Sequence, residues 1–420
     1  MKKYTAVILL TILLTFLAGP VEAFASFDIS SQKAILIDAQ TGQVLFSKNA
    51  HTASYPASVT KIMTAVLALE RGTLTDYVPI SRRASYVEGS RIYLLEGEKV
   101  TLEQVLYGLM LESGNDAAIA IAEYIAGSVE EFAVMMNDKA AQLGAENTNF
   151  TNPNGLHDKE HVTTAYDMAL IAKHAMTLPK FREIVNTVRY IIPETNMQDT
   201  RYLYNGNRII KNTSDKYEGA NGIKTGYTTA AKNCFVGSAQ RDGREYITVI
   251  LNEPDNKALW ANTKALLDYA FENFAQVPVV EAGEVVDKVE FLGSKSEVKI
   301  VAEQGFHYNY PVDSEKPGIQ ENIVMDAIKP TVRTGERVGY IEYSIGDEVV
   351  GTVRLIAQRN DQGKVLASGM VKGETGSSKA GLWGLLLVLP ASLLAFRFLA
   401  KNRRKRRSLY IKKRNIFRKK

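Results

Sequence analysis

Ser58 and Lys61 form a pair that could carry out nucleophilic catalysis. They lie three residues apart at the start of an apolar helix predicted over residues 58–71, so both side chains share one helical face. Apolar surroundings lower the pKa of a lysine, and a neutral amine could then take the serine proton. The helix start would also favour negative charge developing near Ser58. Taken alone, the pair is equally compatible with a serine N-cap and a solvated lysine.

The S-x-x-K pattern occurs at two further positions, and their context separates them from the first. Ser30 lies just before the first predicted strand, and Ser296 lies in a strand predicted to be exposed in a later part of the chain. Only Ser58 opens a long apolar helix. We therefore expect Ser58 to be the nucleophile if the chain is a serine enzyme.

The second motif is Ser113-Gly114-Asn115, between helices predicted over 102–110 and 115–125. A short loop at this point could project both polar side chains into a cleft. The hydroxyl of Ser113 could relay a proton, and the amide of Asn115 could bind a substrate peptide group. A pair of N-caps is the alternative, and the same pattern recurs without that context in Ser47-Lys48-Asn49.

The third motif, Lys224-Thr225-Gly226, lies in a strand predicted over 222–227. On an edge strand, the lysine and the hydroxyl could hold a carboxylate, and the glycine would let a substrate backbone approach closely. The alternative is a plain turn that leads into a strand. A similar triplet, Arg333-Thr334-Gly335, occurs in the later β-rich part of the chain.

The order of the predicted elements indicates how these motifs come together. A hairpin over 34–46 is followed by a long helical segment, which includes helices over 129–143 and 164–176. Strands over 222–227, 234–239 and 246–251 then lead to a helix over 257–274. This pattern predicts an α+β domain, with one sheet built from both ends of the segment and helices packed against it.

A smaller all-β domain is predicted after the catalytic segment, where Pro278 marks the change. It contains alternating segments over 286–291, 297–301, 338–343 and 348–356. The expected division of the chain has six parts. These are a signal peptide (1–25), a catalytic domain (26–276), a β-rich domain (277–366), a linker (367–379), a transmembrane helix (380–400) and a basic cytoplasmic tail (401–420).

The two ends predict export and anchoring. Two lysines precede the apolar run 6–17, and Ala23-Phe24-Ala25 resembles a signal peptidase site, although an uncleaved anchor is the alternative. The apolar segment 381–400 is long enough to span a membrane if Arg397 reaches the interface. Twelve basic residues and no acidic ones follow it. Because positive charge stays on the cytoplasmic side, we expect a single C-terminal anchor in the cell membrane and an extracytoplasmic catalytic domain.

Charge and cysteine content limit the possible partners. The whole chain has a net charge of +5, but the signal segment, Arg397 and the tail hold fifteen of the basic residues. The rest carries 36 basic against 46 acidic residues, a net charge of −10, so we expect no nucleic-acid partner. Cys234 is the only cysteine, which excludes an intrachain disulfide.

A rival pattern, His157-Asp-Lys-Glu-His161, matches the H-x-x-E-H motif of some zinc peptidases. That motif requires a helix to bring both imidazoles to one face. The segment directly follows Asn152-Pro-Asn-Gly155 and is entirely polar, so we interpret it as a solvated loop. We accordingly expect no metal and no other cofactor.

The ordered set of motifs resembles the serine penicillin-binding proteins, and above all the low-molecular-mass D-alanyl-D-alanine carboxypeptidases of peptidase family S11. The flanking residues agree over 35–274. They are Tyr55-Pro-Ala-Ser-Val-Thr-Lys-Ile-Met-Thr64, Leu111-Glu-Ser-Gly-Asn-Asp-Ala-Ala118, Asn152-Pro-Asn-Gly-Leu156 and Gly222-Ile-Lys-Thr-Gly-Tyr-Thr228.

The resemblance implies a penicillin-binding transpeptidase-like fold, in which an antiparallel sheet has helices on both faces. It also implies a role for each matched residue. Ser58 would attack the penultimate D-alanine of a peptidoglycan stem peptide, with Lys61 as base and Ser113 as proton relay. The backbone N–H groups of Ser58 and Tyr227 would form the oxyanion hole.

Binding roles follow from the same resemblance. Asn115 would orient the substrate amide, Lys224 and Thr225 would hold the terminal carboxylate of D-Ala-D-Ala, and Gly226 completes the motif. β-Lactams would act as covalent inhibitors.

Two departures bear on the family assignment. Position 114 is Gly, as in the carboxypeptidases, whereas class A β-lactamases have Asp there, and no match to their deacylating glutamate is found. An arginine shortly before K-T-G occurs in some carboxypeptidases, but Arg208 aligns with it only loosely.

A non-catalytic cell-wall binder or β-lactam sensor on the same fold is the remaining alternative. Against it, every polar group that the chemistry needs is present, and twenty residues are too few for a cytoplasmic signalling domain.

Overall fold

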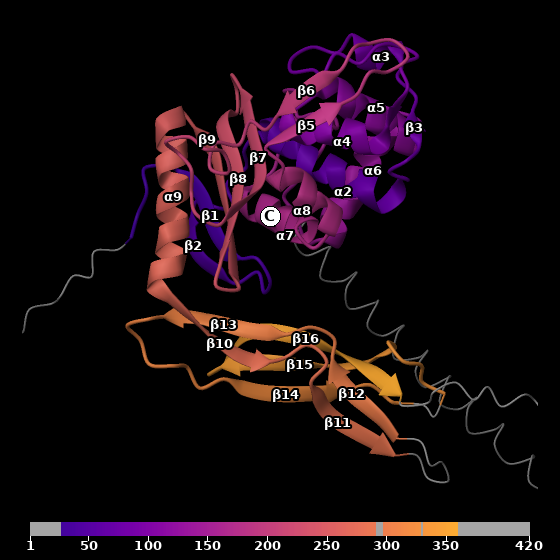
Figure 1. The fold of residues 1–420 in the computed structure, drawn as a ribbon. Coiled ribbons are helices and arrows are strands. Elements are labelled where there is room, and N and C mark those ends of the chain that lie inside the picture. Colours follow the sequence, from indigo (N-terminus) through magenta and orange to yellow (C-terminus); the bar gives the residue numbers. More distant parts are fainter. Residues whose placement is uncertain (1–26, 291–296, 329–330, 360–420) are drawn as a thin grey trace, which may run out of the picture. The chain divides into compact units, whose positions relative to one another are not determined.

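The computed structural model describes residues 27–290, 297–328 and 331–359 (Figure 1). The predicted signal peptide, the linker, the predicted transmembrane helix and the basic tail lie outside these ranges. Within them, no helix is both long enough and apolar enough to cross a membrane.

The catalytic segment is built on a five-stranded antiparallel sheet. Its strand order is β2-β1-β9-β8-β7. The strands are β1 (Lys33–Asp38), β2 (Val44–Lys48), β7 (Ala220–Thr228), β8 (Lys232–Arg241) and β9 (Arg244–Glu253). The first strand pairs with the last, with Ile35 opposite Val249. The prediction that both ends of the segment contribute to one sheet is confirmed, and β7 is an edge strand.

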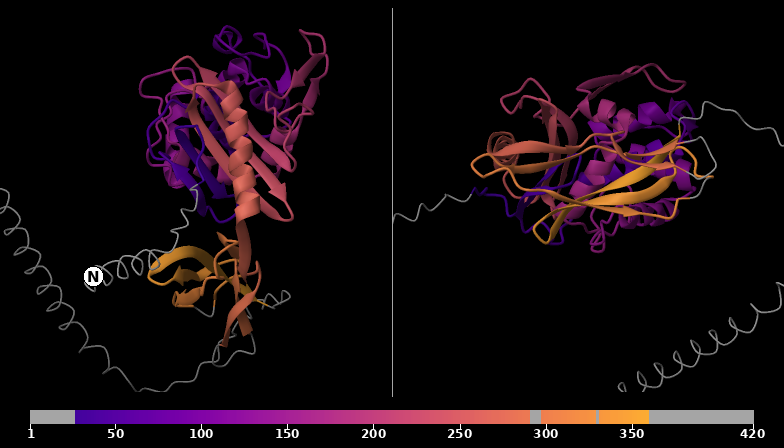
Figure 2. Two further views of the ribbon diagram at one scale, coloured as in Figure 1. Left: turned by 90° about the vertical axis from the view of Figure 1, so that its left-hand side faces the viewer. Right: turned by 90° about the horizontal axis from the view of Figure 1, so that it is seen from below.

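Both faces of the sheet are covered, which explains why its inner strands β1, β8 and β9 contain continuous apolar runs. Ile35 and Ile37 pack into the core formed with the large helical group, whereas Leu36 packs with Trp260 of helix α9 (Asn256–Asn273). Successive side chains of a strand point to opposite faces, so one strand serves both cores. Figure 1 shows α9 on one side of the sheet and the other helices on the opposite side, and the left panel of Figure 2 shows α9 lying along the strands.

The predicted helices are present, with ends that match local capping chemistry. Thr101 and Gln104 form a capping box at the start of α4, and the hydroxyl of Thr164 caps α7. The helices on this face are α2 (Lys61–Arg71), α4 (Leu102–Leu111), α5 (Asn115–Ala126), α6 (Val129–Gln142), α7 (Ala165–Ala175) and α8 (Pro179–Asn186).

Several short elements have no counterpart in the sequence analysis, and α8 is one of them. A two-stranded ribbon, β5 (Arg189–Ile192) with β6 (Arg201–Tyr204), follows α8 and leads back towards the sheet. The others are the 3₁₀ turn η1 (Ala57–Thr60), helix α3 (Arg82–Ser85) and the strands β3 (Tyr77–Val78) and β4 (Val100–Thr101).

An all-β region follows α9 directly, because β10 begins at Phe274. One two-stranded sheet pairs β10 with β13, and a five-stranded sheet has the order β11-β12-β16-β15-β14. The strands are β10 (Phe274–Val280), β11 (Val285–Glu290), β12 (Glu297–Ala302), β13 (Phe306–Pro311), β14 (Gln320–Met325), β15 (Arg337–Ile345) and β16 (Glu348–Arg359). Pro278 lies inside β10, in a two-stranded sheet where a missing N–H donor is tolerated.

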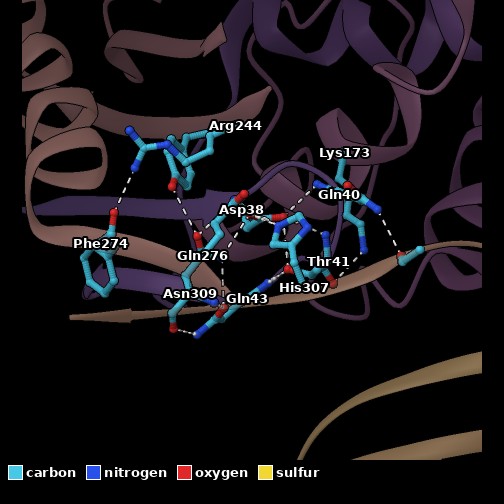
Figure 3. A network of polar contacts seen from close by, with 12 residues as sticks. Asp38, Gln40, Thr41, Gln43, Lys173, Arg244, Phe274, Gln276, His307 and Asn309 are labelled. Carbon is cyan, nitrogen blue, oxygen red and sulfur yellow. Dashed lines mark hydrogen bonds and ion pairs between the residues drawn. The ribbon is translucent and has the colours of Figure 1, made fainter. Parts of the chain in front are cut away.

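A buried carboxylate joins β1 to this all-β region (Figure 3). Asp38 is 1% exposed and accepts hydrogen bonds from His307 at 2.7 Å, Asn309 at 3.0 Å and Gln276 at 3.2 Å, besides the backbone N–H of Thr41 at 2.8 Å. Burial alone would raise the pKa of Asp38, but the bond from His307 and the other donors hold it below its usual value. The network therefore keeps a buried charge satisfied where β1, β10 and β13 meet.

Candidate active site

The sequence predicted Ser58 in the first turn of an α-helix. It lies instead in the 3₁₀ turn η1 that precedes α2. The residue before it, Ala57, has a φ of +49°, which is rare for a residue with a side chain. The backbone of Gly155 packs against this bend, since a Cβ there would lie 1.9 Å from the Ala57 carbonyl oxygen. The strained turn leaves Ser58 half-buried on the wall of a pocket of about 400 Å³.

Lys61 is fully buried, so the alternative of a solvated lysine is wrong. Its Nζ lies 3.0 Å from Ser58 Oγ, 2.8 Å from Asn115 Oδ1 and 2.6 Å from the carbonyl oxygen of Asn154. The first two motifs and the Asn-Pro-Asn-Gly turn therefore meet at one amine.

The surroundings of Lys61 favour the neutral amine. Burial, followed by the positive charge of Lys224, lowers the pKa of Lys61 well below its usual value, and the carboxylate of Asp116 opposes this only in part. A buried amine loses its hydration, which disfavours the ammonium form. This is the condition under which a lysine can accept a proton from a serine at neutral pH.

In the second motif, the side chain of Asn115 has hydrogen-bond partners and that of Ser113 has none among the described residues. Asn115 donates from Nδ2 to the Glu88 carbonyl oxygen at 2.6 Å, while its Oδ1 accepts from Lys61, so its amide is fixed on both sides. Ser113 has a φ of +59°, and its buried Oγ has no hydrogen-bond partner among the described residues. The hydroxyl lies on the same pocket wall as Ser58. It is thus available to a bound substrate.

The third motif lies on β7, the edge strand next to η1. Gly226 is required here, because a Cβ at this position would lie 2.9 Å from the backbone nitrogen of Ser58. Thr225 and Tyr227 line the same pocket, and the Tyr227 side chain is largely exposed. The structure therefore brings the backbone of 225–227 against the turn that carries Ser58.

Lys224 is the second buried lysine of the site. Its Nζ donates to the carbonyl oxygen of Thr225 at 3.1 Å. Burial lowers the pKa of Lys224 to about 7, against the opposing effect of the Glu112 carboxylate. Glu112 in turn accepts from the backbone N–H of Tyr204 at 2.6 Å and so ties β6 to the end of α4.

Arg208 also lines the pocket, although the sequence alignment left its position open. Its guanidinium forms an ion pair with Asp215 and lies 5.8 Å from the centre of the Trp260 ring. This places a cationic side chain on the pocket wall beside Trp260 of α9.

Some groups that shape the site were missed by sequence reasoning. Asp116 is fully buried and accepts from the backbone N–H groups of Ile92 and Leu94, which fixes the loop beside Asn115. Burial raises the pKa of Asp116, and these backbone donors lower it in part. The sequence could have indicated Asp116, because it directly follows the Ser-Gly-Asn motif. The Asn154 carbonyl oxygen gives no such signal, because a backbone atom carries no residue type.

The H-x-x-E-H segment is not a helix, and it does not form a paired-imidazole face. His157 is exposed and packs against the Tyr55 ring at 4.6 Å. The interpretation of a solvated loop fits residues 156–160 and is wrong for His161, which is 2% exposed. Both ring nitrogens of His161 have partners, Thr60 on one side and Thr151 on the other.

Comparisons with known proteins agree with this geometry. Residues 20–255 match the family described as D-alanyl-D-alanine carboxypeptidase, and residues 274–362 match the penicillin-binding protein 5 C-terminal domain. D-alanyl-D-alanine carboxypeptidase DacF of Bacillus subtilis is 33% identical over 375 residues, which cover 86% of this chain and 95% of that protein.

Solved structures show the same likeness. Penicillin-binding protein 5 from Haemophilus influenzae superimposes with a TM-score of 0.65 at 28% identity, covering 80% of this chain and 98% of that one. A peptidoglycan synthesis regulatory factor (PBP3) from Streptococcus pneumoniae gives a TM-score of 0.62 at 27% identity, covering 79% and 99%. The chain belongs to the D-alanyl-D-alanine carboxypeptidases of peptidase family S11.

Proposed function

We propose that this carboxypeptidase removes the terminal D-alanine of peptidoglycan stem pentapeptides through an acyl-enzyme on Ser58. The observation that carries the proposal is the contact of Lys61 with Ser58 Oγ at 3.0 Å in a fully buried setting. A neutral amine has two N–H groups and one lone pair. The carbonyl oxygens of Asn115 and Asn154 can only accept, so they take the two N–H groups. The lone pair then faces the Ser58 hydroxyl.

The acylation step follows from this arrangement. Lys61 takes the proton of Ser58 as Oγ attacks the carbonyl carbon of the penultimate D-alanine. The backbone N–H groups of Ser58 and Tyr227 hold the resulting oxyanion, and such donors are worth about 10²–10³ in kcat when one is removed. The ammonium of Lys61 returns this proton to Ser113 as Ser113 gives its own hydroxyl proton to the nitrogen of the departing D-alanine, and the C–N bond breaks. Water then hydrolyses the ester and releases Ser58.

Substrate binding would use the remaining groups of the three motifs. Lys224 and Thr225 hold the terminal carboxylate, Asn115 orients the substrate amide, and Gly226 lets the substrate backbone lie close to β7. A β-lactam would enter the same pocket, and its ring opening would leave Ser58 acylated.

Mass spectrometry after exposure to penicillin tests the nucleophile. We expect a stable adduct on the peptide that contains Ser58, and Ser58→Ala should show only background labelling. An adduct on another residue would overturn the serine assignment. Activity that survives Ser58→Ala but disappears with a chelator would instead support metal chemistry. Binding without any turnover of a D-Ala-D-Ala peptide would support a sensor.

We also propose that the chain is exported and held at the cell membrane by a helix at 380–400, so that the catalytic domain (26–276) and the β-rich domain (277–366) act outside the cytoplasm. The apolar segment and the twelve basic residues after it support this. A chain that ends at Ser378 should be secreted in soluble form and keep full activity on soluble peptide. If it still sediments with membranes after a high-salt wash, another surface is the anchor.

A further inference from the structure

His161 is buried directly behind the nucleophile turn, in a place that the reaction itself does not use. Its Nε2 lies 2.9 Å from Thr60 Oγ1, and Thr60 stands between Ser58 and Lys61 in the sequence. Its Nδ1 lies 3.0 Å from the backbone nitrogen of Thr151, at the start of the turn that contains Asn154. One ring therefore connects the two backbone segments that meet at Lys61.

The hydrogen-bond directions define the form of this ring. The N–H of Thr151 can only donate, so Nδ1 of His161 accepts and carries no proton. In the neutral ring the proton is then on Nε2, which donates to the hydroxyl oxygen of Thr60. Burial, opposed by the charge of Asp158 and reinforced by His157 and Lys61, lowers the pKa of His161 to about 4. The neutral ring with its proton on Nε2 is thus the form at neutral pH.

Other contacts show that the 151–155 turn depends on its docking against η1 and α2. The hydroxyl of Thr64 donates to the Pro153 carbonyl oxygen at 2.6 Å, and Lys61 donates to the next carbonyl, Asn154, also at 2.6 Å. Gly155 then packs against Ala57 with no room for a side chain. A shift of this turn would move the Asn154 carbonyl oxygen, and with it the direction of the Lys61 lone pair.

We propose that His161 is a positioning residue for the general base. By joining Thr60 to Thr151, it fixes the Asn154 carbonyl oxygen relative to η1 and so aims the lone pair of Lys61 at Ser58 Oγ. This inference rests on the proposed function of Lys61 and Ser58. Misplacing a reacting group by about 1 Å can cost ~100-fold in rate, so loss of this link should lower the rate of the chemical step rather than the affinity for the ligand.

Four variants test separately the hydrogen bonds of His161 to Thr60 and to Thr151. His161→Phe keeps a ring of similar size and removes both nitrogens, and Thr60→Val keeps the shape of the threonine and removes its hydroxyl. His161→Gln restores an N–H near the position of Nε2, and His161→Asn restores an acceptor near Nδ1. The matched control is His157→Phe, in the same segment, which keeps the ring contact with Tyr55 and removes no hydrogen bond to η1.

The experiment measures acylation of the full-length protein by a fluorescent penicillin, separating the saturating rate constant from the dissociation constant, with a thermal unfolding curve for each variant. We expect His161→Phe to lower the acylation rate constant by about 10- to 100-fold with little change in the dissociation constant. Thr60→Val should lower it less, and His161→Gln and His161→Asn should each recover part of the loss. In the double variant His161→Phe/Thr60→Val, the loss should be smaller than the product of the single losses.

The outcomes are distinguishable. If the wild-type protein is not acylated at Ser58, the proposed function fails and the positioning role fails with it. If the wild-type protein is acylated and folded His161→Phe retains a rate constant within about twofold, the positioning role alone is wrong. A lower unfolding temperature without any loss of acylation rate would show that His161 only stabilises the fold.

Discussion

The regions before and after Phe274 differ in how many polar side chains they bury. Among the described residues, the catalytic region holds nearly all the buried polar and charged side chains, including two lysines, whereas in the all-β region only Asn309 is of this kind. Every described residue other than glycine with a positive φ also lies before Phe274, among them Ala57 and Ser113 at the pocket. In the described part of the all-β region, glycines alone have a positive φ.

This difference indicates which region carries the active site. A buried amine and a strained backbone both cost free energy, so a fold keeps them only where the surroundings enforce them. In the catalytic region the two fully buried lysines and the strained residues Ala57 and Ser113 converge on one pocket, whereas the buried side chains described in the all-β region are apolar except for Asn309. The comparison implies that changes to buried polar groups should affect activity in the first region, and mainly stability at the junction with the second.

The largest effect is expected from Lys61→Met. This change keeps an unbranched side chain of similar length but removes the base, so the acylation rate should fall by ~1,000-fold or more, as in other enzymes that lose a member of a catalytic set. The unfolding temperature should change by only about 5 °C, because removal of a buried amine offsets the lost hydrogen bonds. Acylation kinetics and calorimetry would measure both quantities.

Lys173→Met is the matched control for this prediction. Burial also lowers the pKa of Lys173, and its Nζ donates to the Thr41 carbonyl oxygen at 3.0 Å, away from the pocket. Its loss should leave acylation within about twofold. An equal loss of activity in the two variants would mean that buried lysines serve the fold in general, and the contrast would disappear.

A smaller effect is expected from Lys224→Ala. A hydrogen bond to a charged group is worth ~1.5–3 kcal/mol, so kcat/KM for a peptide ending in D-Ala-D-Ala should fall by roughly ten- to a hundredfold. A matching ester or amide with a blocked carboxylate should lose much less, because it never makes the contact. Lys224→Arg should recover part of the loss. Equal losses on free and blocked substrates would contradict the carboxylate-binding role.

The pH dependence of kcat/KM gives a third test, since Lys61 must be neutral and Lys224 charged. The value for a free-carboxylate peptide should rise as Lys61 loses its proton and fall above about pH 7, where Lys224 in the free enzyme loses its own. A blocked substrate should lack the descending limb. Lys224→Arg should lack it as well, because arginine stays charged. A descending limb that persists in both would assign it to another group.

The sequence predicted the sheet, the main helices and the three motifs because each has a local signal. The apolar runs of β1, β8 and β9, the cap at Thr101 and the spacing of Ser58 and Lys61 can all be recognised within a few residues. Each motif pattern occurs more than once in the chain, and the order of the predicted elements indicated which occurrences lie together. At one of the other S-x-x-K positions, Ser30 bonds to Asn262 instead of a lysine amine.

Other features could not be predicted, because they depend on distant contacts. The positive φ of Ala57 is enforced by the backbone of Gly155, almost a hundred residues later, and alanine itself gives no sign of it. His161 looked solvated because its neighbours are polar, and it is buried by the pairing of Thr163 with Ser54 and of Val162 with Asn149. Strand β10 contains Pro278, which normally argues against a strand.

The smallest effect on activity is expected at the junction, from Asp38→Asn. Asparagine would place an NH₂ group against the donors of Asn309 or Gln276, and we expect a loss of about 1–3 kcal/mol in unfolding free energy. Because Asp38 lies away from the pocket residues, kcat/KM on a soluble peptide should stay within about threefold. Asp326→Asn, in an exposed ion pair with Arg337, is the control and should cost less than ~1 kcal/mol.

The pH dependence of this loss has a definite sign. The folded-state pKa of Asp38 is lowered, so the carboxylate contributes its stability above the unfolded value of about 3.9 and loses that contribution as the pH falls through the lower folded value. The difference in unfolding temperature between wild type and Asp38→Asn should therefore be constant above about pH 5 and shrink below about pH 4. Calorimetry from pH 3 to 8 would measure it. A difference that does not change with pH would mean that the charge of Asp38 contributes nothing, and a large loss of activity would mean that the junction supports the active site directly.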